Sequence, residues 1–464
     1  MSLTEIAGAM NGTILECDRP DELFLDGVVD TDSRLIEPGG LFFAKPGEVT
    51  DGHLFIGAAI ERGASVAVVD HAVADPIPQV LVADTVEALG MLAKHVVARV
   101  REASELTIVG ITGSNGKTTT KNLVAALCAR LGPTVAPRDS FNNEVGAPLT
   151  MLKLGLDTRY LVLELGASGI GHIKRLTDLA APDIGVVLMV GLAHAGEFGG
   201  VESTVLAKSE LVTGLVSGAP VILNADDPRV AGMAELATGE VLWFGQGSAS
   251  QVKASNIDVS LSGTSFDLTM PSGQTSRVNF AVLGEHHVMN ALAMVSVGHV
   301  LGVGLSEIVS TLESVVRAER WRMEIMGGHG VTVINDAYNA SPDSMAAGLK
   351  TLRQVSTPGH RTIAVLGEMS ELGDYAGEEH DRLALLVVRL NIDQLVVVGT
   401  GARRLHISAM NEGSWDGESQ FFENADDAYD YLVSFCRPED IVLVKSSNSA
   451  GLRFLGDRLA GAFE

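Results

Sequence analysis

One stretch decides the fold of this 464-residue chain: Leu106-Thr-Ile-Val-Gly-Ile-Thr-Gly-Ser-Asn-Gly-Lys-Thr118. Its first half is an apolar, β-branched run, which is typical of a buried strand. The spacing of Leu123, Val124 and Leu127 predicts that a helix follows, through about Arg130. A glycine-rich loop between a strand and a helix points several N–H groups at one spot, and the helix adds its positive end. The stretch therefore predicts a phosphate-binding loop.

The loop has variant spacing. The common pattern places a glycine five residues before Gly116, whereas this chain has Ile111 there. Lys117 can still reach the outer phosphates of a nucleotide, and Thr118 can offer its hydroxyl to Mg²⁺. Such a loop does not by itself separate a ligase from a kinase, a motor or a switch. The residues expected to bind ATP here are Gly113, Ser114, Asn115, Gly116, Lys117, Thr118 and Thr119.

Three downstream residues could serve the same chemistry. Glu164 ends an apolar run, and His194 follows another, so both are expected beyond the carboxyl ends of strands, where ligands bind in doubly wound sheets. Glu164 could hold Mg²⁺, which prefers oxygen ligands. Lys208, taken alone, reads as a surface lysine paired with a nearby acid.

Alternating strands and helices predict an α/β fold with mostly parallel sheets and helices on both faces. We expect three domains, at residues 1–103, 104–318 and 319–464, since domains average roughly 150 residues. Residues 250–282 alternate polar and apolar positions and predict antiparallel strands, and a helix is expected at 290–301. Other strands are expected at 65–69, 80–82, 106–111, 160–165, 184–190, 221–224, 331–335, 362–366, 394–398 and 440–444.

Composition limits the partners and the cellular compartment that we expect for this chain. The formal net charge of -25 disfavours a nucleic-acid partner, because excess acidity repels phosphate backbones. Cys17, Cys128 and Cys436 lie far apart without metal-ligand spacing, as expected for reduced thiols in a cytoplasmic protein. No apolar stretch reaches the roughly 18–20 residues that a membrane span needs.

With these residues in hand, the chain resembles the Mur ligase family nearly end to end. That family has a Thr-Gly-x-x-Gly-Lys-Thr loop, matched by Thr112 through Thr118, which accounts for the variant spacing. Asp32-Ser33-Arg34 and Asp51-Gly-His53 match family members that bind UDP-sugars. Three further stretches favour the dipeptide-adding branch: Phe141-Asn-Asn-Glu-Val-Gly-Ala-Pro-Leu-Thr150, Asp336-Ala-Tyr-Asn-Ala-Ser-Pro-Asp-Ser-Met345 and Val365-Leu-Gly-Glu-Met-Ser-Glu-Leu-Gly373.

The resemblance implies a three-domain ATP-dependent ligase of peptidoglycan precursor synthesis. The first domain would bind uridine diphosphate, the central P-loop-type domain ATP, and a Rossmann-like third domain would close over both. The γ-phosphate of ATP would pass to the carboxylate of UDP-N-acetylmuramoyl-tripeptide, and D-Ala-D-Ala would attack the resulting acyl phosphate. We expect a monomer that uses ATP and Mg²⁺ and binds no nucleic acid.

The resemblance also implies roles for single residues. Lys117 would stabilise the transferring phosphoryl group, and Thr118 with Glu164 would bind one Mg²⁺, while His194 would help bind a second. Lys208 aligns with a lysine that is often carbamylated, which turns it into a carboxylate-like metal ligand and requires a neutral amine first. Asn290, Arg322 and Asp336 would contact ATP, and the substrate contacts would come from Ser33, Arg34, Asn142, Asn143 and Asn339.

Five positions depart from the family pattern. Met189 stands where many relatives have Asn, and His287 replaces the first Asn of a nucleotide-contacting His-Asn-x-x-Asn-Ala motif. Ser341 replaces Asn, His172 replaces a common Glu, and Asn448 occupies a position that is often Arg. These departures put substrate and adenine contacts in doubt more than the class of reaction.

Two alternatives remain open. The chain could be another amide-forming ligase of this fold that adds a single amino acid, or a folylpolyglutamate synthase. The Asp-Asn-Pro-Arg-type motif of the enzyme that adds the third residue of the stem peptide is absent from the sequence, which argues against that enzyme. The chain could also be a nucleotide-dependent switch with decayed catalysis, although the presence of Lys117, Thr118, Glu164, His194 and Lys208 argues against decay.

Overall fold

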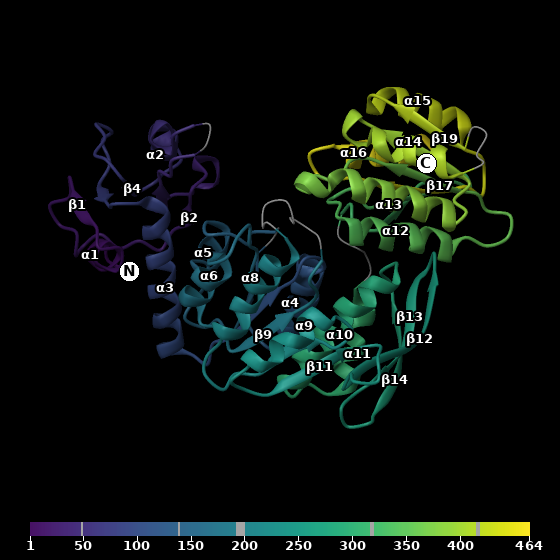
Figure 1. Cartoon of the computed structure of the whole chain (residues 1–464). Helices are drawn as coiled ribbons and strands as arrows, with labels where there is room; N and C mark the ends of the chain where they lie inside the picture. The colour runs from purple at the N-terminus through teal and green to yellow at the C-terminus, as the bar shows by residue number, and fades with distance from the viewer. Residues whose placement is uncertain (48–49, 138–139, 192–199, 316–319, 414–417) are drawn as a thin grey trace.

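The computed structural model describes residues 1–47, 50–137, 140–191, 200–315, 320–413 and 418–464. Three sheets succeed one another along the chain, each in its own domain (Figure 1). This confirms the predicted three-domain α/β class. The exact boundaries stay predictions, and the one at 318 lies outside the described residues.

The N-terminal sheet has the strand order β1-β5-β4-β3-β2, and only the β1–β5 pair is antiparallel. Its strands are β1 (Thr13–Leu15), β2 (Val29–Asp30), β3 (Leu41–Phe43), β4 (Val66–Val69) and β5 (Gln79–Leu81). Its helices are α1 (Leu3–Ala9), η1 (Ser33–Leu35), η2 (Gly52–Phe55), α2 (Ile56–Glu61) and α3 (Thr85–Ala103).

The central sheet has the order β14-β13-β12-β11-β10-β9-β6-β8-β7, in which β12, β13 and β14 form an antiparallel ribbon. Neighbouring residues of β6 face opposite sides: Ile108 packs with α6 and α8, and Val109 packs with α4 and α10. The strands are β6 (Thr107–Thr112), β7 (Thr134–Val135), β8 (Tyr160–Glu164), β9 (Ile184–Val187), β10 (Val221–Asn224), β11 (Val241–Gly245), β12 (Val252–Ser260), β13 (Gly263–Thr269) and β14 (Thr275–Phe280). The helices are α4 (Lys117–Leu131), α5 (Gly146–Met151), α6 (His172–Ala180), α8 (Val201–Thr213), α9 (Pro228–Ala231), η3 (Gly232–Leu236), α10 (Glu285–Val300) and α11 (Leu305–Ser314).

The C-terminal sheet has the order β15-β16-β20-β17-β18-β19 and is parallel except for β15. Helices α12 to α14 cover one face, and α15 with α16 cover the other. The strands are β15 (Glu324–Met326), β16 (Thr332–Asn335), β17 (Thr362–Leu366), β18 (Gln394–Val398), β19 (Ser419–Phe422) and β20 (Ile441–Lys445). The helices are α12 (Pro342–Val355), η4 (Gly373–Tyr375), α13 (Ala376–Arg389), η5 (Thr400–Ala402), α14 (Arg403–Glu412), α15 (Ala425–Phe435) and α16 (Leu452–Ala462).

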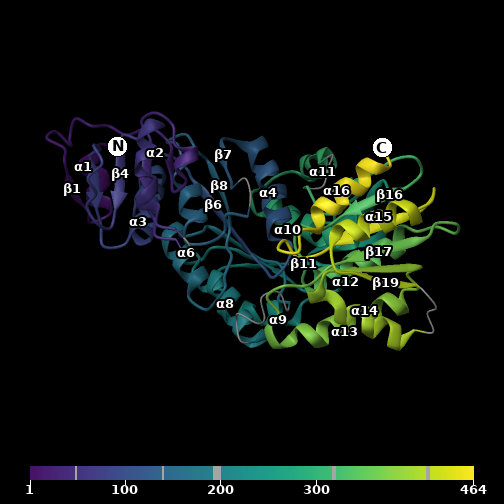
Figure 2. The same ribbon diagram turned by 90° about the horizontal axis from the view of Figure 1, so that it is seen from above.

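Helix α3 joins the first two domains. Its first half contributes Leu89 and Leu92 to the N-terminal core, and its second half contributes Val97 and Val100 to the central core. Figures 1 and 2 both show the helix running along the boundary between these domains. The two domains therefore share one continuous helix, whose apolar side packs into one core along its first half and into the other along its second half.

The strand predictions hold to within a few residues, and those at 221–224, 362–366 and 394–398 match β10, β17 and β18. The helix predicted at 290–301 is wrong at its start, because α10 begins at Glu285. Gly284 is the N-cap of this helix, and its φ of +112° is a backbone conformation that favours glycine.

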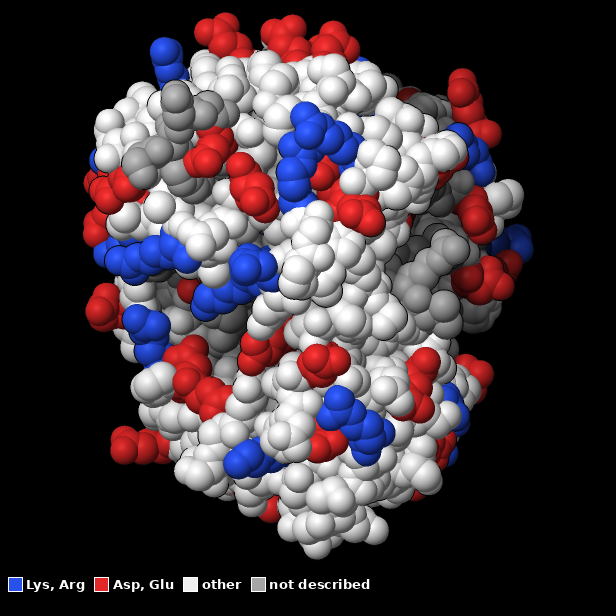
Figure 3. Space-filling view, turned by 90° about the vertical axis from the view of Figure 1, so that its right-hand side faces the viewer, with Lys and Arg blue, Asp and Glu red and all other residues white. Residues whose placement is uncertain are grey.

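The surface carries mixed charge. On the face shown in Figure 3, basic side chains are interspersed with acidic ones, and acidic side chains gather along the top, where Figure 1 places α15. Asp426 and Asp427 lie in the first turn of that helix, where the helix dipole favours negative charge. Within the described segments, no helix is both long and apolar enough to cross a bilayer.

Candidate functional site

The phosphate loop lies between β6 and α4, as predicted. Gly116 forms the N-cap of α4 with φ at +84°, a left-handed conformation that favours glycine. A Cβ at this position would also collide with Oδ1 of Asn290. Because glycine has no side chain to cap the helix, the first-turn N–H groups of α4 are left to a ligand.

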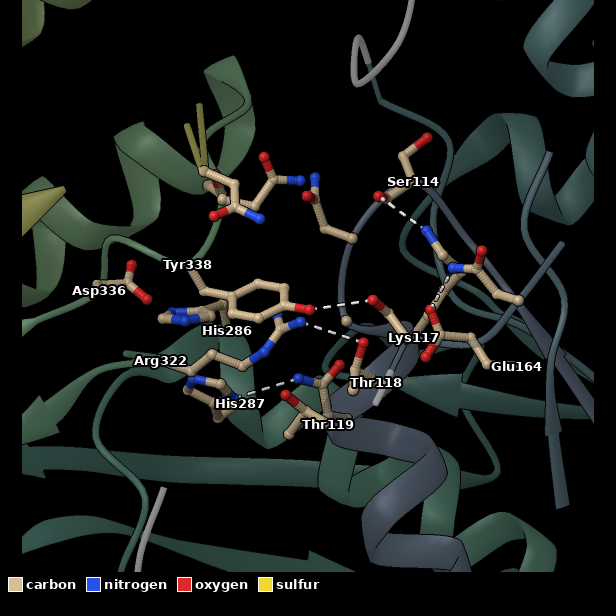
Figure 4. Close-up of a pocket in the computed structure, with 18 of the residues that line it drawn as sticks. Ser114, Lys117, Thr118, Thr119, Glu164, His286, His287, Arg322, Asp336 and Tyr338 are labelled. Atoms are coloured by element: carbon tan, nitrogen blue, oxygen red, sulfur yellow. Dashed lines mark hydrogen bonds between the residues drawn. The ribbon is translucent and has the colours of Figure 1, made fainter. Parts of the chain in front are cut away.

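Lys117 and Glu164 lie on the same side of the cavity that the loop borders (Figure 4). Nζ of Lys117 donates to the carbonyl oxygen of Gly113 at 2.8 Å. Burial lowers the pKa of Lys117, and Arg322 adds to this shift, whereas the Glu164 carboxylate opposes it. The amine thus stays close to the loop backbone that would hold the phosphates.

Glu164 is 1% exposed, and its two oxygens differ. Oε1 accepts a hydrogen bond from Nδ2 of Asn142 at 2.8 Å. Oε2 is buried and has no hydrogen-bond partner among the residues that the structure describes. A buried carboxylate oxygen without a partner is costly, so its environment suits a hard cation or a bound donor.

The third domain reaches the loop through Arg322 and Tyr338. The Arg322 guanidinium donates to the Thr118 hydroxyl at 3.1 Å and lies over the Tyr338 ring, 4.2 Å from its centroid. The hydroxyls of Tyr338 and Ser140 form a hydrogen bond of 3.0 Å. Figure 4 shows Tyr338 and Arg322 extending toward Thr118 and Lys117. Arg322 therefore contacts the residue predicted to bind Mg²⁺.

Asp336 lines the same cavity, but its carboxylate has protein partners. Oδ2 lies 2.6 Å from Nζ of Lys445, and Oδ1 accepts from the backbone N–H of Met323 at 3.0 Å. Lys445 also donates to the carbonyl oxygen of Asn339 at 3.1 Å. The ion pair between Asp336 and Lys445 therefore holds together the segments of the third domain that border the loop cavity.

A second cavity, of about 540 Å³, meets the loop cavity, of about 350 Å³, at Lys117 and Asn142. Lys208 lies in its wall and is only 4% exposed. Burial, with the nearby charge of Lys117, lowers the pKa of Lys208 to about 7. The interpretation of Lys208 as a surface lysine is therefore wrong, and a large share of its amine is neutral near neutral pH.

The guanidinium of Arg175 borders this second cavity. His172, which begins α6, borders it as well. Arg175 also pairs with Glu87 of α3 across 2.9 Å. The cavity is thus suited to an anionic substrate that approaches from the side of α3.

Three further positions that depart from the family pattern lie at or near the loop cavity. Sδ of Met189 lies 3.9 Å from Nδ2 of Asn115. Ser341 caps α12 and donates to Oδ1 of Asn115 at 3.0 Å, which ties the third domain to the loop. Asn448 borders the loop cavity.

Other predicted residues lie apart or have structural partners. Ser33 and Arg34 lie in η1 of the first domain and line neither cavity. Oδ1 of Asn143 accepts from the N–H of Gly146 at 2.9 Å, at the start of α5. His194 lies outside the described residues. Gathered around the loop cavity are Ser114, Asn115, Gly116, Lys117, Thr118, Thr119, Asn142, Glu164, Asn290, Arg322, Asp336 and Asn339.

Sequence reasoning missed Tyr338 and Lys445 as site residues. Both lie at or just beyond the carboxyl ends of strands, β16 and β20. The rule that drew attention to Glu164, applied to the third domain, would have found them. His286 also borders the cavity and is the His of the His-Asn-x-x-Asn-Ala motif, whereas Ser140, which borders it too, carried no comparable signal.

Comparison with known proteins agrees with this geometry. The Mur ligase middle domain matches residues 111–298, the Mur ligase glutamate ligase domain residues 321–448, and the Mur ligase family catalytic domain residues 28–97. The UDP-N-acetylmuramoyl-tripeptide–D-alanyl-D-alanine ligase of Mycobacterium tuberculosis is 40% identical, covering 99% of this chain and 97% of its own length. The Synechocystis ligase of the same name is 32% identical, over 97% of this chain and 96% of its own.

The solved structures agree as well. A crystal structure of MurF from Acinetobacter baumannii matches with a TM-score of 0.88 and 30% identity, covering 99% of this chain and 98% of that one. Matched along all three domains in sequence and in fold, the chain belongs to the Mur ligase family.

Proposed function

We propose that this chain is an ATP-dependent amide ligase that joins D-Ala-D-Ala to UDP-N-acetylmuramoyl-tripeptide. The observation that carries the proposal is the meeting of two cavities at Lys117 and Asn142, one beside a phosphate loop and one beside Lys208. A ligase of this kind must bring a triphosphate and a carboxylate together, and two adjoining cavities with Lys117 at their junction suit that task. Relatives at 40% and 32% identity carry the name of this activity.

The domains divide the work in the proposal. Residues 1–103 take the uridine diphosphate, with Ser33 and Arg34 as contacts. Residues 104–318 take ATP, and residues 319–464 close over ATP and the acceptor, with Asn339 at the acceptor side. Asn142 and Asn143 contact the peptide-bearing substrate, and the border of the second cavity supports this role.

The reaction has two steps. A carboxylate oxygen of the tripeptide bonds to the γ-phosphorus of ATP, the bond to the bridging oxygen breaks, and ADP leaves. The amine of D-Ala-D-Ala then attacks the acyl carbon and loses a proton, and inorganic phosphate leaves. Lys117 stabilises the charge of the transferring phosphoryl group, while the N–H groups of the loop and of α4 hold the phosphates in place.

Magnesium is the proposed metal, and the residues fit it. Oε2 of Glu164 is buried without a partner among the described residues, and the Thr118 hydroxyl borders the same cavity. These two oxygens would hold one ion, and His194 with a carbamylated Lys208 would hold a second. When bound, the metal neutralises phosphate charge and orients the γ-phosphoryl group.

A panel of acceptors tests the function. We expect phosphate release only when ATP, UDP-N-acetylmuramoyl-tripeptide and D-Ala-D-Ala are all present. Turnover with a single amino acid and none with D-Ala-D-Ala would assign the chain to another branch of the family. ATP hydrolysis that needs no acceptor would favour the decayed switch.

Carbamylation of Lys208 has its own test. A pKa of about 7 supplies the neutral amine that carbamylation needs. We expect Lys208→Ala to lose most activity and to recover part of it with added short carboxylates, which replace the missing ligand. Lys174→Ala, which removes an exposed lysine of α6, is the matched control and should behave as wild type with or without the carboxylate. Little loss in Lys208→Ala, with no rescue, would contradict the carbamate.

We also propose a cellular compartment and an oligomeric state. The substrates are nucleotide-linked precursors and ATP, which supports a cytoplasmic enzyme. We propose that it acts as a monomer, since residues of the central and third domains of a single chain line the loop cavity, and residues of the central domain line the second cavity. Light scattering of the purified full chain measures this directly.

A further inference from the structure

The second cavity has two charged side chains whose partners in the substrate are not assigned above. Arg175 of α6 and Glu144, which follows Asn143, both border it. The cavity measures about 540 Å³, within the size range of small-molecule sites, and it meets the loop cavity at Lys117 and Asn142. A cation and an anion in the wall of one cavity suit a ligand group that carries both charges.

Glu144 lies in a turn that its neighbours hold in place. Oδ1 of Asn143 accepts hydrogen bonds from the backbone N–H groups of Val145, at 3.3 Å, and Gly146, at 2.9 Å. The Glu144 carboxylate itself has no ion pair or side-chain hydrogen bond with any residue in the described ranges. The turn therefore presents a half-buried carboxylate that a cationic group can approach.

Arg175 has a partner that a ligand can replace. Its guanidinium pairs with Glu87 of α3 across 2.9 Å, and the two side chains are 36% and 61% exposed. Such an exposed ion pair adds little stability, so a substrate carboxylate can take the place of Glu87 at small cost. The N–H groups at the start of α6 are less available, because the Glu210 carboxylate accepts from Gly171 and Lys174. An anion in this part of the cavity would therefore bind the guanidinium rather than the start of the helix.

The reaction decides which part of the substrate faces these two side chains. The carboxylate to be activated must reach the phosphates at Lys117, where the cavities meet. That carboxylate belongs to the third residue of the stem peptide. Because ATP occupies the loop cavity, the side chain of the third residue extends into the second cavity. Its far end is then the group that Arg175 and Glu144 can contact.

We propose that Arg175 binds a carboxylate, and Glu144 an ammonium group, at the end of the third residue's side chain. Diaminopimelate carries both groups on its end carbon, whereas lysine carries only the ammonium. A guanidinium can bind a carboxylate through two parallel hydrogen bonds. The chain therefore prefers the precursor that contains diaminopimelate. The inference rests on the proposed function and adds the identity of the third residue.

Four forms of UDP-N-acetylmuramoyl-tripeptide test the inference on the full chain with ATP, Mg²⁺ and D-Ala-D-Ala. Their third residues are diaminopimelate, lysine, 2-aminopimelate and norleucine, whose side chains end in both charged groups, the ammonium alone, the carboxylate alone and neither. The measurement is kcat/KM from phosphate release. We expect diaminopimelate to exceed lysine by about 5- to 50-fold, less than for a fully buried charged contact because Arg175 is partly exposed. It should also exceed 2-aminopimelate.

Two variants assign these preferences to single residues. In Arg175→Gln the loss should be confined to the two substrates with a side-chain carboxylate, so that diaminopimelate falls to the level of lysine. In Glu144→Gln it should be confined to the two with an ammonium. Lys174→Gln changes an exposed neighbour that pairs with Asp178, and this control should keep the wild-type preferences. Each comparison is a ratio within one variant, so a partial loss of folded enzyme does not alter it.

Three results would overturn the inference. The first is a wild-type kcat/KM for diaminopimelate that is no higher than for lysine. The second is an equal loss for all four substrates in Arg175→Gln, which would place the guanidinium on another part of the substrate. The third is a preference for diaminopimelate that persists unchanged in either variant. Failure of all four tripeptides to support phosphate release would instead contradict the proposed function.

Discussion

The central domain meets its two neighbours in different ways. Toward the N-terminal domain the junction is apolar, because α3 contributes Leu92 to one core and Val97 to the next. Toward the C-terminal domain, the contacts beside the loop are polar: Arg322 to Thr118, Tyr338 to Ser140 and Ser341 to Asn115. Away from these contacts, Leu283 of the central domain is buried in the apolar core of the C-terminal domain, so this junction has an apolar part as well.

The difference indicates which junction can move. Separating α3 from either core would expose apolar side chains to water, whereas the polar contacts can be exchanged for contacts with water or a ligand at small net cost. Each polar contact also ends on a residue that borders the loop cavity. We therefore expect the third domain to open and close over the nucleotide while the first two move as one body.

The largest effect is expected at the apolar junction. Leu92→Ala should lower the free energy of unfolding by about 2–5 kcal/mol, because the side chain is 2% exposed and its removal leaves a cavity. Calorimetric unfolding measures this, with Leu54→Ala, at a side chain 77% exposed, as the control expected within about 0.5 kcal/mol of wild type. A loss below about 1 kcal/mol for Leu92→Ala would show that α3 does not hold the two domains together.

A smaller effect is expected for Arg322→Gln at the polar junction. Loss of a charged group that we propose donates to the phosphates should lower kcat/KM for ATP by about 10- to 100-fold, the equivalent of about 1.5–3 kcal/mol. Thermal stability should hardly change. Arg320→Gln removes an exposed arginine that pairs with Asp457, and it serves as the matched control with near-wild-type kinetics. Equal kinetic losses in both variants would mean that Arg322 acts only through the fold.

The smallest effect is expected for Tyr338→Phe, which removes one hydroxyl contact of about 0.5–1.5 kcal/mol. Small-angle scattering should show a larger radius of gyration for the nucleotide-free variant than for wild type. With all ligands bound the two should agree. Tyr429→Phe, on α15 in the outer layer of the third domain, should scatter as wild type in both states. An unchanged radius of gyration in wild type on ligand binding would contradict closure.

Much of the fold follows from local pattern. The buried strands β10, β17 and β18 are short apolar runs between turn residues, and the predicted bounds of all three agree with the structure. The short strands β2 and β7, of two residues each, carry too little pattern to detect. Their pairing depends on tertiary contacts rather than on their own residues.

The site was predictable where residues sit on the loop or at the ends of strands. Glu164 and Lys117 were found in this way, and Lys208 only through the resemblance. The burial of Lys208 and the contact from Arg322 to Thr118 could not be deduced, because each depends on how segments far apart in sequence pack.

Helix α3 has a consequence for the choice of substrate. A shared helix sets a fixed spacing between η1, where the uridine diphosphate is proposed to bind, and the loop at β6. A substrate anchored at one end must then be long enough for its far carboxylate to reach the phosphates at the loop. The spacing that α3 sets would therefore bear on the length of peptide that the enzyme accepts.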